Sequence, residues 1–158
     1  MKIKRLISIV ACWLALYTAS GQIQWKQVEP GVWKGMVGKP EAYSLLGVSG
    51  AAPLKEGFKL LPEVGLPAMA SGVVSRIEAG KTMLRLPLRK EEQLYGFGLN
   101  FQTVHQRGKI LNLHVDHYGG KDTGRTHAPV PFYVSSAGYG VFINSARYLT
   151  VYAGSAAR

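Results

Sequence analysis

The feature that most constrains the fold of this chain is a set of short runs in which apolar and polar residues alternate. In one run, Leu84, Leu86 and Leu88 alternate with other residues, the period of two that a strand with one buried face produces. Pro87 lacks a backbone N–H and therefore indicates an edge strand or a bulge. Further runs with strand character cover residues 32–37, 73–78, 131–134, 139–143 and 148–152.

Turn residues separate these runs, and after residue 21 no window of about eleven residues keeps helical spacing. The connection from Ser135 to Gly138 is polar and ends in glycine, which predicts a hairpin. The segment from Tyr43 to Ala70 predicts irregular connection or weak strand. Many short strands with turns between them predict an all-β fold, an antiparallel β-sandwich. With 158 residues and 47% hydrophobic side chains, the chain suits one domain.

The first 21 residues have the pattern of a secretory signal peptide. Basic residues at positions 2, 4 and 5 precede an uncharged apolar run from Leu6 to Ala19, and small residues then lead to Gly21. The apolar run is shorter than the roughly 20 residues of a membrane-spanning helix, so we expect no stable membrane span. We expect export to the periplasm or the cell exterior, and a domain that occupies residues 22–158.

The single cysteine, Cys12, belongs to this leader. Residues 9–12 resemble a bacterial lipobox, in which the cysteine becomes the lipidated first residue of the exported protein. The apolar region before it, from Leu6 to Ala11, is shorter than the roughly 7–15 residues of an ordinary signal peptide, so lipidation at Cys12 is the less favoured alternative. Either cleavage leaves no cysteine for a disulfide, a thiol nucleophile or a metal site within the folded domain.

The formal net charge is +10, from 19 basic and 9 acidic residues. A nucleic-acid site requires basic residues clustered on one face. Here the basic residues are scattered from Lys26 to Arg147 without a cluster. We interpret them as a solvated surface and expect no nucleic-acid partner.

Histidine and aspartate crowd into one segment. Between positions 105 and 127 lie all the histidines and both aspartates: His105, His114, Asp116, His117, Asp122 and His127. One interpretation is a metal site, because imidazole and carboxylate groups bind zinc. On a strand, however, His114 and Asp116 share one face and His117 points to the other. We therefore expect polar surface residues and no metal.

A second interpretation makes Asp116 and Asp122 the acid and base of glycoside hydrolysis, which uses two carboxylates about 5–10 Å apart. Both lie on one glycine-rich loop without the rigid support that catalysis requires. A third interpretation is that the loop lends polar groups to a pocket formed mainly elsewhere. The chain has no G-x-S-x-G elbow. The sequence Gly96-Phe97-Gly98 lacks the third glycine of a dinucleotide fingerprint and predicts a turn or bulge, with no cofactor.

Three motifs follow one another in the second half of the chain: EQLYGFGL at 92–99, GRTHAPVPFYVS at 124–135 and GYGVFIN at 138–144. In this order they resemble the N-terminal β-sandwich of glycoside hydrolase family 31, which includes α-glucosidases and α-xylosidases. Members carry an E-x-x-Y-G-x-G turn, a loop, a P-F-Y strand and a G-Y-G-V strand. The resemblance is strong from Arg85 to Gly154 and looser from Trp25 to Thr82.

This resemblance implies a galactose mutarotase-like sandwich that packs against a (β/α)₈ barrel. In the family, the barrel supplies both catalytic aspartates for a retaining hydrolysis. The chain stops at Arg158, before any barrel, so the resemblance implies a fragment without a catalytic residue and inactive alone. The sandwich itself is expected to be open to further strands at its C-terminal end.

The family's sandwich sends a loop into the barrel mouth, where it shapes the sugar pocket. By position, this loop corresponds to the segment between residues 112 and 127. The resemblance therefore implies that Asp116 touches substrate, with His117, Asp122 and Arg125 as its neighbours. The alternative is that Asp122 and Arg125 only cap the loop or pair within it.

Two functions follow from these observations. The first is the N-terminal domain of an exported retaining α-glycosidase that acts on oligosaccharide or polysaccharide. The second is a free-standing carbohydrate-binding or structural sandwich whose aromatic residues stack on sugar rings. Most of these residues lie within strand patterns, which favours core packing. They are Trp25, Trp33, Tyr95, Tyr118, Tyr133, Tyr139, Tyr148 and Tyr152.

Overall fold

The computed structural model describes residues 23–39, 41–45, 47, 60–100, 103–115 and 128–155. These residues form the strands β1 (Gln24–Glu29), β2 (Val32–Met36), β3 (Val74–Glu78), β4 (Lys81–Arg85), β5 (Leu94–Gly98), β6 (Ile110–Leu113), β7 (Pro129–Ser135), β8 (Tyr139–Phe142) and β9 (Leu149–Tyr152). A 3₁₀ turn, η1 (Ala68–Gly72), precedes β3. The predicted signal peptide, residues 1–21 with Cys12, lies outside the described residues. Within the described ranges, no helix combines the length and apolar character that a bilayer span requires.

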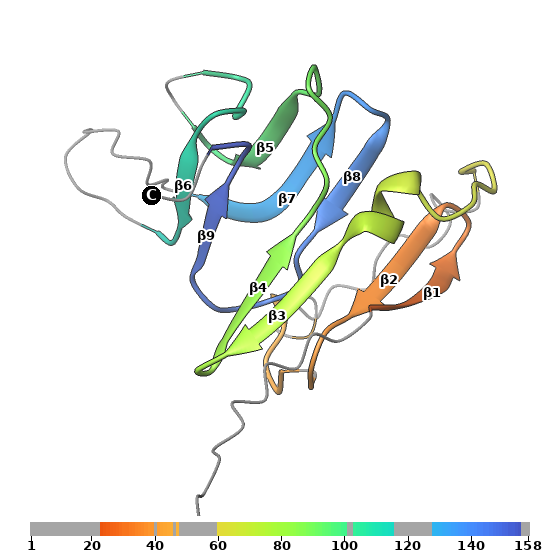
Figure 1. Ribbon diagram of the computed structural model, residues 1–158, viewed down its shortest axis with the longest axis horizontal. Coiled ribbons are helices and arrows are strands. Elements are labelled where there is room, and N and C mark those ends of the chain that lie inside the picture. Colours follow the sequence, from red (N-terminus) through yellow and green to blue (C-terminus); the bar gives the residue numbers. More distant parts are fainter. Residues whose placement is uncertain are drawn as a thin grey trace, which may run out of the picture.

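All the strand pairs are antiparallel. β1 pairs with β2, β3 with β4 and β6 with β9, while β5, β7 and β8 form a three-stranded sheet with β7 in the centre. The predicted all-β, antiparallel class is therefore confirmed. Figure 1 shows β6 and β9 on the side of the molecule opposite to β1 and β2.

The hairpin of β7 and β8 forms where the sequence predicts it. Gly138 has a φ of 84°, in the left-handed region that glycine adopts without strain. Its N–H donates a hydrogen bond to the carbonyl of Ser135 over 3.0 Å. Along β7, Tyr133 and Ser135 are buried and the residues next to them are exposed. The register places Tyr139 opposite Ser135, so both side chains lie on the same face of the sheet.

The sequence Gly96-Phe97-Gly98 forms a bulge in β5, as predicted. The register with β7 shifts between Gly96 and Gly98, and Phe97 has a φ of 65°. Phe97 is only 1% exposed, so the bulge delivers its ring to the core. The side-chain amide of Asn100 donates to the carbonyls of Gly96 and Gly98 over 3.1 and 3.2 Å. These bonds satisfy carbonyl groups near the point where the bulge interrupts the ladder.

The hydrophobic core joins the β5–β7–β8 sheet to the β6–β9 sheet. Its buried members are Leu94, Phe97, Leu111, Leu113, Tyr133 and Ala153, with Leu86, Leu88, Tyr139, Val141, Leu149 and Val151 packed against them. The rings of Phe97 and Tyr133 stack with 5.0 Å between centroids. Full burial of a large apolar side chain stabilises a fold by about 1.5–3 kcal/mol, so this contact holds β5 against β7. Leu111 and Leu113 of β6 bring the second sheet into the same core.

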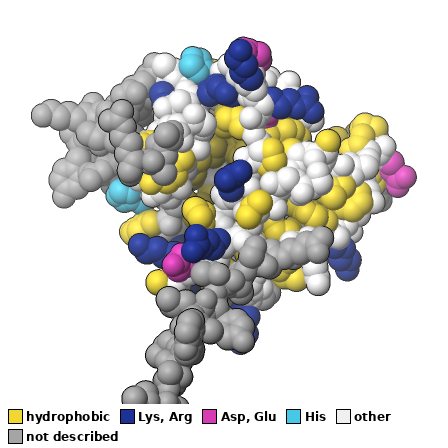
Figure 2. All heavy atoms as spheres, in the orientation of Figure 1, with side chains coloured by type: hydrophobic (Ala, Val, Ile, Leu, Met, Phe, Trp, Pro, Cys, Tyr) yellow, Lys and Arg dark blue, Asp and Glu magenta, His cyan; other side chains and the backbone are white. Residues whose placement is uncertain are grey.

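The prediction of a half-buried strand through Leu84 and Leu88 is wrong in part. β4 ends at Arg85, two residues before Pro87, which cannot donate the hydrogen bond that would extend the ladder. All the residues of β4 are exposed. Leu86 and Leu88 lie beyond the strand and do pack against the core. Figure 2 shows hydrophobic side chains gathered over the region of β1 to β4. Among the described residues, this region contributes no side chain to the core cluster.

Three strands and two aromatic positions depart from the expectations. β1, β5 and β6 were not predicted as strands. β1 is mostly polar, and the glycines of β5 predicted only a turn or bulge. Tyr148 and Tyr152 are 84% and 49% exposed. The prediction of core packing is therefore wrong for these two tyrosines, although it is confirmed for Tyr133, which is 7% exposed.

Candidate functional site

Most of the predicted substrate-binding segment, from residue 116 to residue 127, lies outside the described residues. It contains all four candidates: Asp116, His117, Asp122 and Arg125. The strands on either side of it are described, and both contribute core side chains, Leu113 from the end of β6 and Tyr133 from β7. The segment therefore departs from one core strand and leads back into another.

The structure describes two histidines of the predicted cluster, and they do not form one site. His105 makes an isolated β-bridge with Tyr95. His114 instead packs its ring against that of Tyr148, with 5.2 Å between centroids. The described part of the chain holds no group of three His, Cys, Asp or Glu side chains that could bind a metal. Since residues 116–127 lie outside it, the expected absence of a metal stays a prediction.

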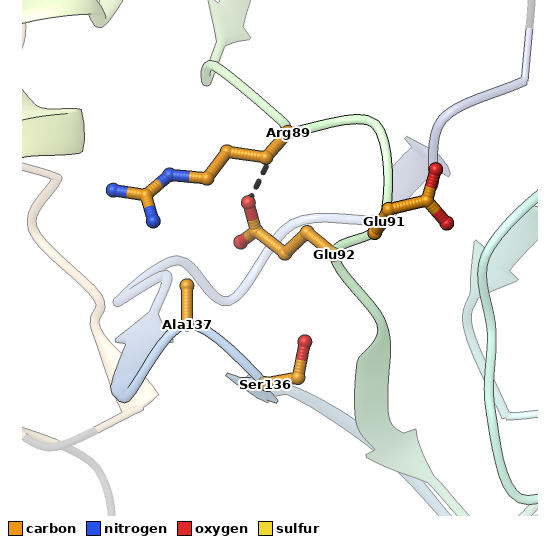
Figure 3. A pocket seen from close by; sticks show the side chains of 5 residues that line it. All are labelled: Arg89, Glu91, Glu92, Ser136 and Ala137. Atoms are coloured by element: carbon orange, nitrogen blue, oxygen red, sulfur yellow. Dashed lines mark hydrogen bonds between the residues drawn. The ribbon is translucent and has the colours of Figure 1, made fainter.

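A polar network that the sequence analysis missed centres on Glu92, which is 5% exposed. Glu92 lies just before β5 and beside the turn between β7 and β8. With Arg89, Glu91, Ser136 and Ala137 it lines a hollow of about 180 Å³. Figure 3 shows the Glu92 carboxylate turned toward Arg89, whereas the side chain of Glu91 points away.

Both carboxylate oxygens of Glu92 accept hydrogen bonds from within the fold. Oε2 accepts from the backbone N–H of Arg89 over 2.9 Å. Oε1 accepts from the hydroxyl groups of Tyr139, over 2.5 Å, and Ser135. The hydroxyl oxygen of Ser135 accepts in turn from the N–H of Ala137 over 3.0 Å. The carboxylate thus ties the start of β5 to the β7–β8 hairpin.

Arg107 binds the backbone segment that carries Glu92. Its Nη1 donates to the carbonyls of Arg89, over 2.9 Å, and Glu92, over 2.6 Å. The N–H of Glu92 also donates to the carbonyl of Arg89 over 3.2 Å. These bonds fix the backbone of residues 89–92, which holds the Glu92 side chain against the hairpin.

The electrostatics of the network keep Glu92 ionised. Burial raises the pKa of its carboxyl, but the hydrogen bonds from Ser135, Tyr139 and Arg89, together with the charge of Arg89, bring the pKa below its ordinary value of 4.5. Burial and then the bond to Glu92 raise the pKa of Tyr139. At neutral pH a carboxylate therefore accepts hydrogen bonds from a neutral phenol.

This arrangement supports structure and not catalysis by Glu92. A general acid must hold a proton at working pH, and a nucleophile needs a free oxygen facing the substrate. The Glu92 carboxyl has a lowered pKa and donors on both oxygens. The glutamate of the E-x-x-Y-G-x-G motif at 92–98 is thus a structural residue. The sequence feature that could have identified Glu92 is its position at the start of this motif, ahead of the Gly96-Phe97-Gly98 bulge.

Comparison with known proteins agrees with the fold. The sequence profile of the glycosyl hydrolase 31 N-terminal galactose mutarotase-like domain matches residues 58–151. An alpha-xylosidase from Emericella nidulans is 38% identical over 65 residues, 41% of this chain and 8% of that protein. An isomaltosyltransferase from Sporosarcina globispora is 33% identical over 57 residues, 36% of this chain and 5% of that protein.

A third relative, the alpha-xylosidase XylQ from Lactiplantibacillus pentosus, is 30% identical over 71 residues, 45% of this chain and 9% of that protein. The matched part of the chain therefore spans less than a tenth of the length of each of these three relatives.

Proposed function

Because this chain belongs to the family of glycosyl hydrolase 31 N-terminal galactose mutarotase-like domains, we propose that it is the N-terminal β-sandwich of an exported retaining α-glycosidase. In this proposal a (β/α)₈ barrel supplies the catalytic residues and the sandwich supports the barrel. The observation that carries the proposal is the profile match over residues 58–151, which includes most of both sheets that form the core. The two relatives named as alpha-xylosidases support an α-linked sugar as the substrate.

The proposed contact with substrate is the segment that holds Asp116. Asp116 binds a sugar hydroxyl, and His117, Asp122 and Arg125 stand beside it. Two described features support this assignment. β6 and β7, which flank the segment, are both held in the core, so the segment starts and ends at rigid strands, as functional loops commonly do.

The chain alone is proposed to be inactive. Retaining hydrolysis needs two carboxyl groups about 5–5.5 Å apart, one of them free to attack. Among the described residues, the buried carboxyl is that of Glu92, and both of its oxygens accept hydrogen bonds from the fold.

The test begins with the coding DNA beyond Arg158. Any barrel encoded there is expressed together with this chain, and hydrolysis of aryl α-xylosides and α-glucosides is compared with that of the chain alone. We expect turnover only with the barrel. In the active protein, Asp116→Asn should lower kcat/KM about 10- to 100-fold, since a hydrogen bond to substrate contributes about 1.4–2.7 kcal/mol. Glu91→Gln, at an exposed position, serves as the control.

Turnover by the chain alone would refute the assignment of catalysis to a barrel. An unchanged kcat/KM in Asp116→Asn would remove that residue from the substrate site.

Export is checked separately by N-terminal sequencing of the protein made in its own host. We expect the mature chain to begin at Gln22, because small residues precede it after an apolar run. A chain that starts at a lipidated Cys12 would show the lipobox alternative to be the correct one. An intact Met1 would contradict both forms of export.

A further inference from the structure

The β6–β9 sheet has one face in the core and the other exposed. Leu111, Leu113, Leu149 and Val151 face the core. The alternate residues on the two paired segments form the outer face, by which we mean Ile110, Asn112, His114, Tyr148, Thr150 and Tyr152. Four of these six residues are exposed, and Asn112 and His114 are partly exposed.

The outer face has an aromatic ring toward each end and hydrogen-bonding groups between. Tyr152 lies opposite Ile110, and Thr150 opposite Asn112, with the Thr150 hydroxyl donating to the Asn112 side-chain oxygen over 3.3 Å. At the other end, the rings of Tyr148 and His114 meet at 60°. Four residues of extended chain separate the two tyrosines by roughly 13 Å.

The exposure of the tyrosines is the unusual part of this surface. Tyr148 is 84% exposed and Tyr152 49%, although large aromatic rings are mostly buried in folded domains. The ring of Tyr148 packs against the ring of His114. An exposed ring that already packs against a neighbour, as Tyr148 does against His114, offers a flat surface to a ligand at a small entropic cost.

The chemistry of the outer face selects a neutral, hydroxyl-rich ligand. The C–H faces of a pyranose ring lie favourably against the electron-rich face of a phenol, and its hydroxyls bond to amide, hydroxyl and imidazole groups such as those of Asn112, Thr150 and His114. Residues 110–114 and 148–152 contain no Asp, Glu, Lys or Arg. An anionic polymer would require basic residues here.

The size of the face argues against a protein partner. Two strands about 4.8 Å apart and five residues long present roughly 10 Å by 16 Å, far less than the about 800 Å² that each side of a stable protein interface buries. A chain of several sugar rings fits a narrow strip with one aromatic ring near each end.

We propose that the outer face of the β6–β9 sheet binds a neutral oligosaccharide, with Tyr148 and Tyr152 stacking on separate sugar rings. This site consists of residues 110–114 and 148–152, does not include Asp116 and needs no catalysis. It goes beyond the proposed function and rests on it only for the class of ligand.

Titration calorimetry of the full chain tests the proposal with xyloglucan heptasaccharide, maltoheptaose and, as an anionic comparison, an oligogalacturonide of similar length. We expect at least one neutral ligand to bind. Tyr148→Ala and Tyr152→Ala should each weaken binding about 2- to 10-fold, the effect of losing one aromatic contact. Tyr148→Phe keeps the ring and should bind nearly as well. Tyr43→Ala, at a tyrosine 74% exposed and outside this face, should change nothing.

Several outcomes overturn the proposal: no binding of either neutral ligand, binding of the oligogalacturonide alone, or an equal loss in Tyr43→Ala. Light scattering tests one further outcome that would overturn the proposal. If the chain forms a dimer and Tyr148→Ala dissociates it, this face is a contact between two copies of the chain. Circular dichroism verifies that each variant is folded. Because binding is measured without turnover, its result is independent of whether a barrel or Asp116 acts as proposed.

Discussion

Replacing Gly98 with alanine is expected to cost more than about 4 kcal/mol of the free energy of unfolding, a large part of the roughly 5–15 kcal/mol that stabilises an ordinary domain. A Cβ on Gly98 would lie 2.0 Å from the carbonyl oxygen of Ala128 and 2.9 Å from the backbone nitrogen of Val130. Both are backbone atoms at the start of the paired strand β7 and cannot rotate away. The φ of 97° at Gly98 adds strain for any residue with a Cβ.

Gly80→Ala is the matched control for Gly98→Ala. Gly80 also has a positive φ, of 75°, but nothing lies within 4 Å of the Cβ that alanine would add. Only the backbone strain remains, at about 1–2 kcal/mol. Urea unfolding followed by circular dichroism measures both variants. A similar loss in the two would show that close packing of β5 on β7 does not set the requirement for glycine.

Glu92→Gln is expected to lower the free energy of unfolding by about 2–3 kcal/mol at pH 7. The amide retains the size of the side chain but removes the charge, and hydrogen bonds to a charged group contribute about 1.5–3 kcal/mol each. Its NH₂ group must also face either the N–H of Arg89, which cannot accept, or the hydroxyl groups of Ser135 and Tyr139, which would have to stop donating and accept instead. Glu91→Gln changes an exposed neighbour and should alter stability by less than about 0.5 kcal/mol.

The same carboxyl predicts how stability depends on pH. Its pKa is lower in the folded chain than the ordinary value of 4.5, so the folded state binds this proton less tightly than the unfolded state does. The stabilisation is therefore fully present above about pH 4.5 and is lost as the pH falls through the folded pKa. Thermal unfolding between pH 7 and pH 3 should show a steeper loss in the wild type than in Glu92→Gln. Parallel curves would mean that Glu92 contributes nothing to the acid sensitivity.

Local patterns were sufficient to predict the hairpin and the bulge. The β7–β8 turn depends on Gly138 and the polar residues beside it, and the β5 bulge on two glycines around Phe97. Both are set by neighbours a few residues apart, so the sequence contains what is needed to recognise them. The same holds for β2, β3 and β9, each of which lies in one short run rich in β-branched or aromatic residues.

The candidate site was predicted less completely. Asp116 and its neighbours were selected by composition and resemblance, and they remain proposals. The role of Glu92 could not be read from its own segment, because the hydroxyl groups of Ser135 and Tyr139 stand 43 and 47 residues further along the chain. Only the register of β5, β7 and β8 brings them to one carboxylate.

By itself, the sequence determined the all-β class, most of the strands and the chemistry of the turns, because these depend on spacing along the chain. The tertiary structure alone decided which faces are covered. Of the alternating leucines, Leu84 lies in β4 and is exposed, whereas Leu86 and Leu88 pack against the core. β9 pairs with β6 and buries only one of its two faces. Whether Tyr148 enters a core or meets solvent depends on whether a second layer of residues distant in sequence covers it, and no local pattern records that.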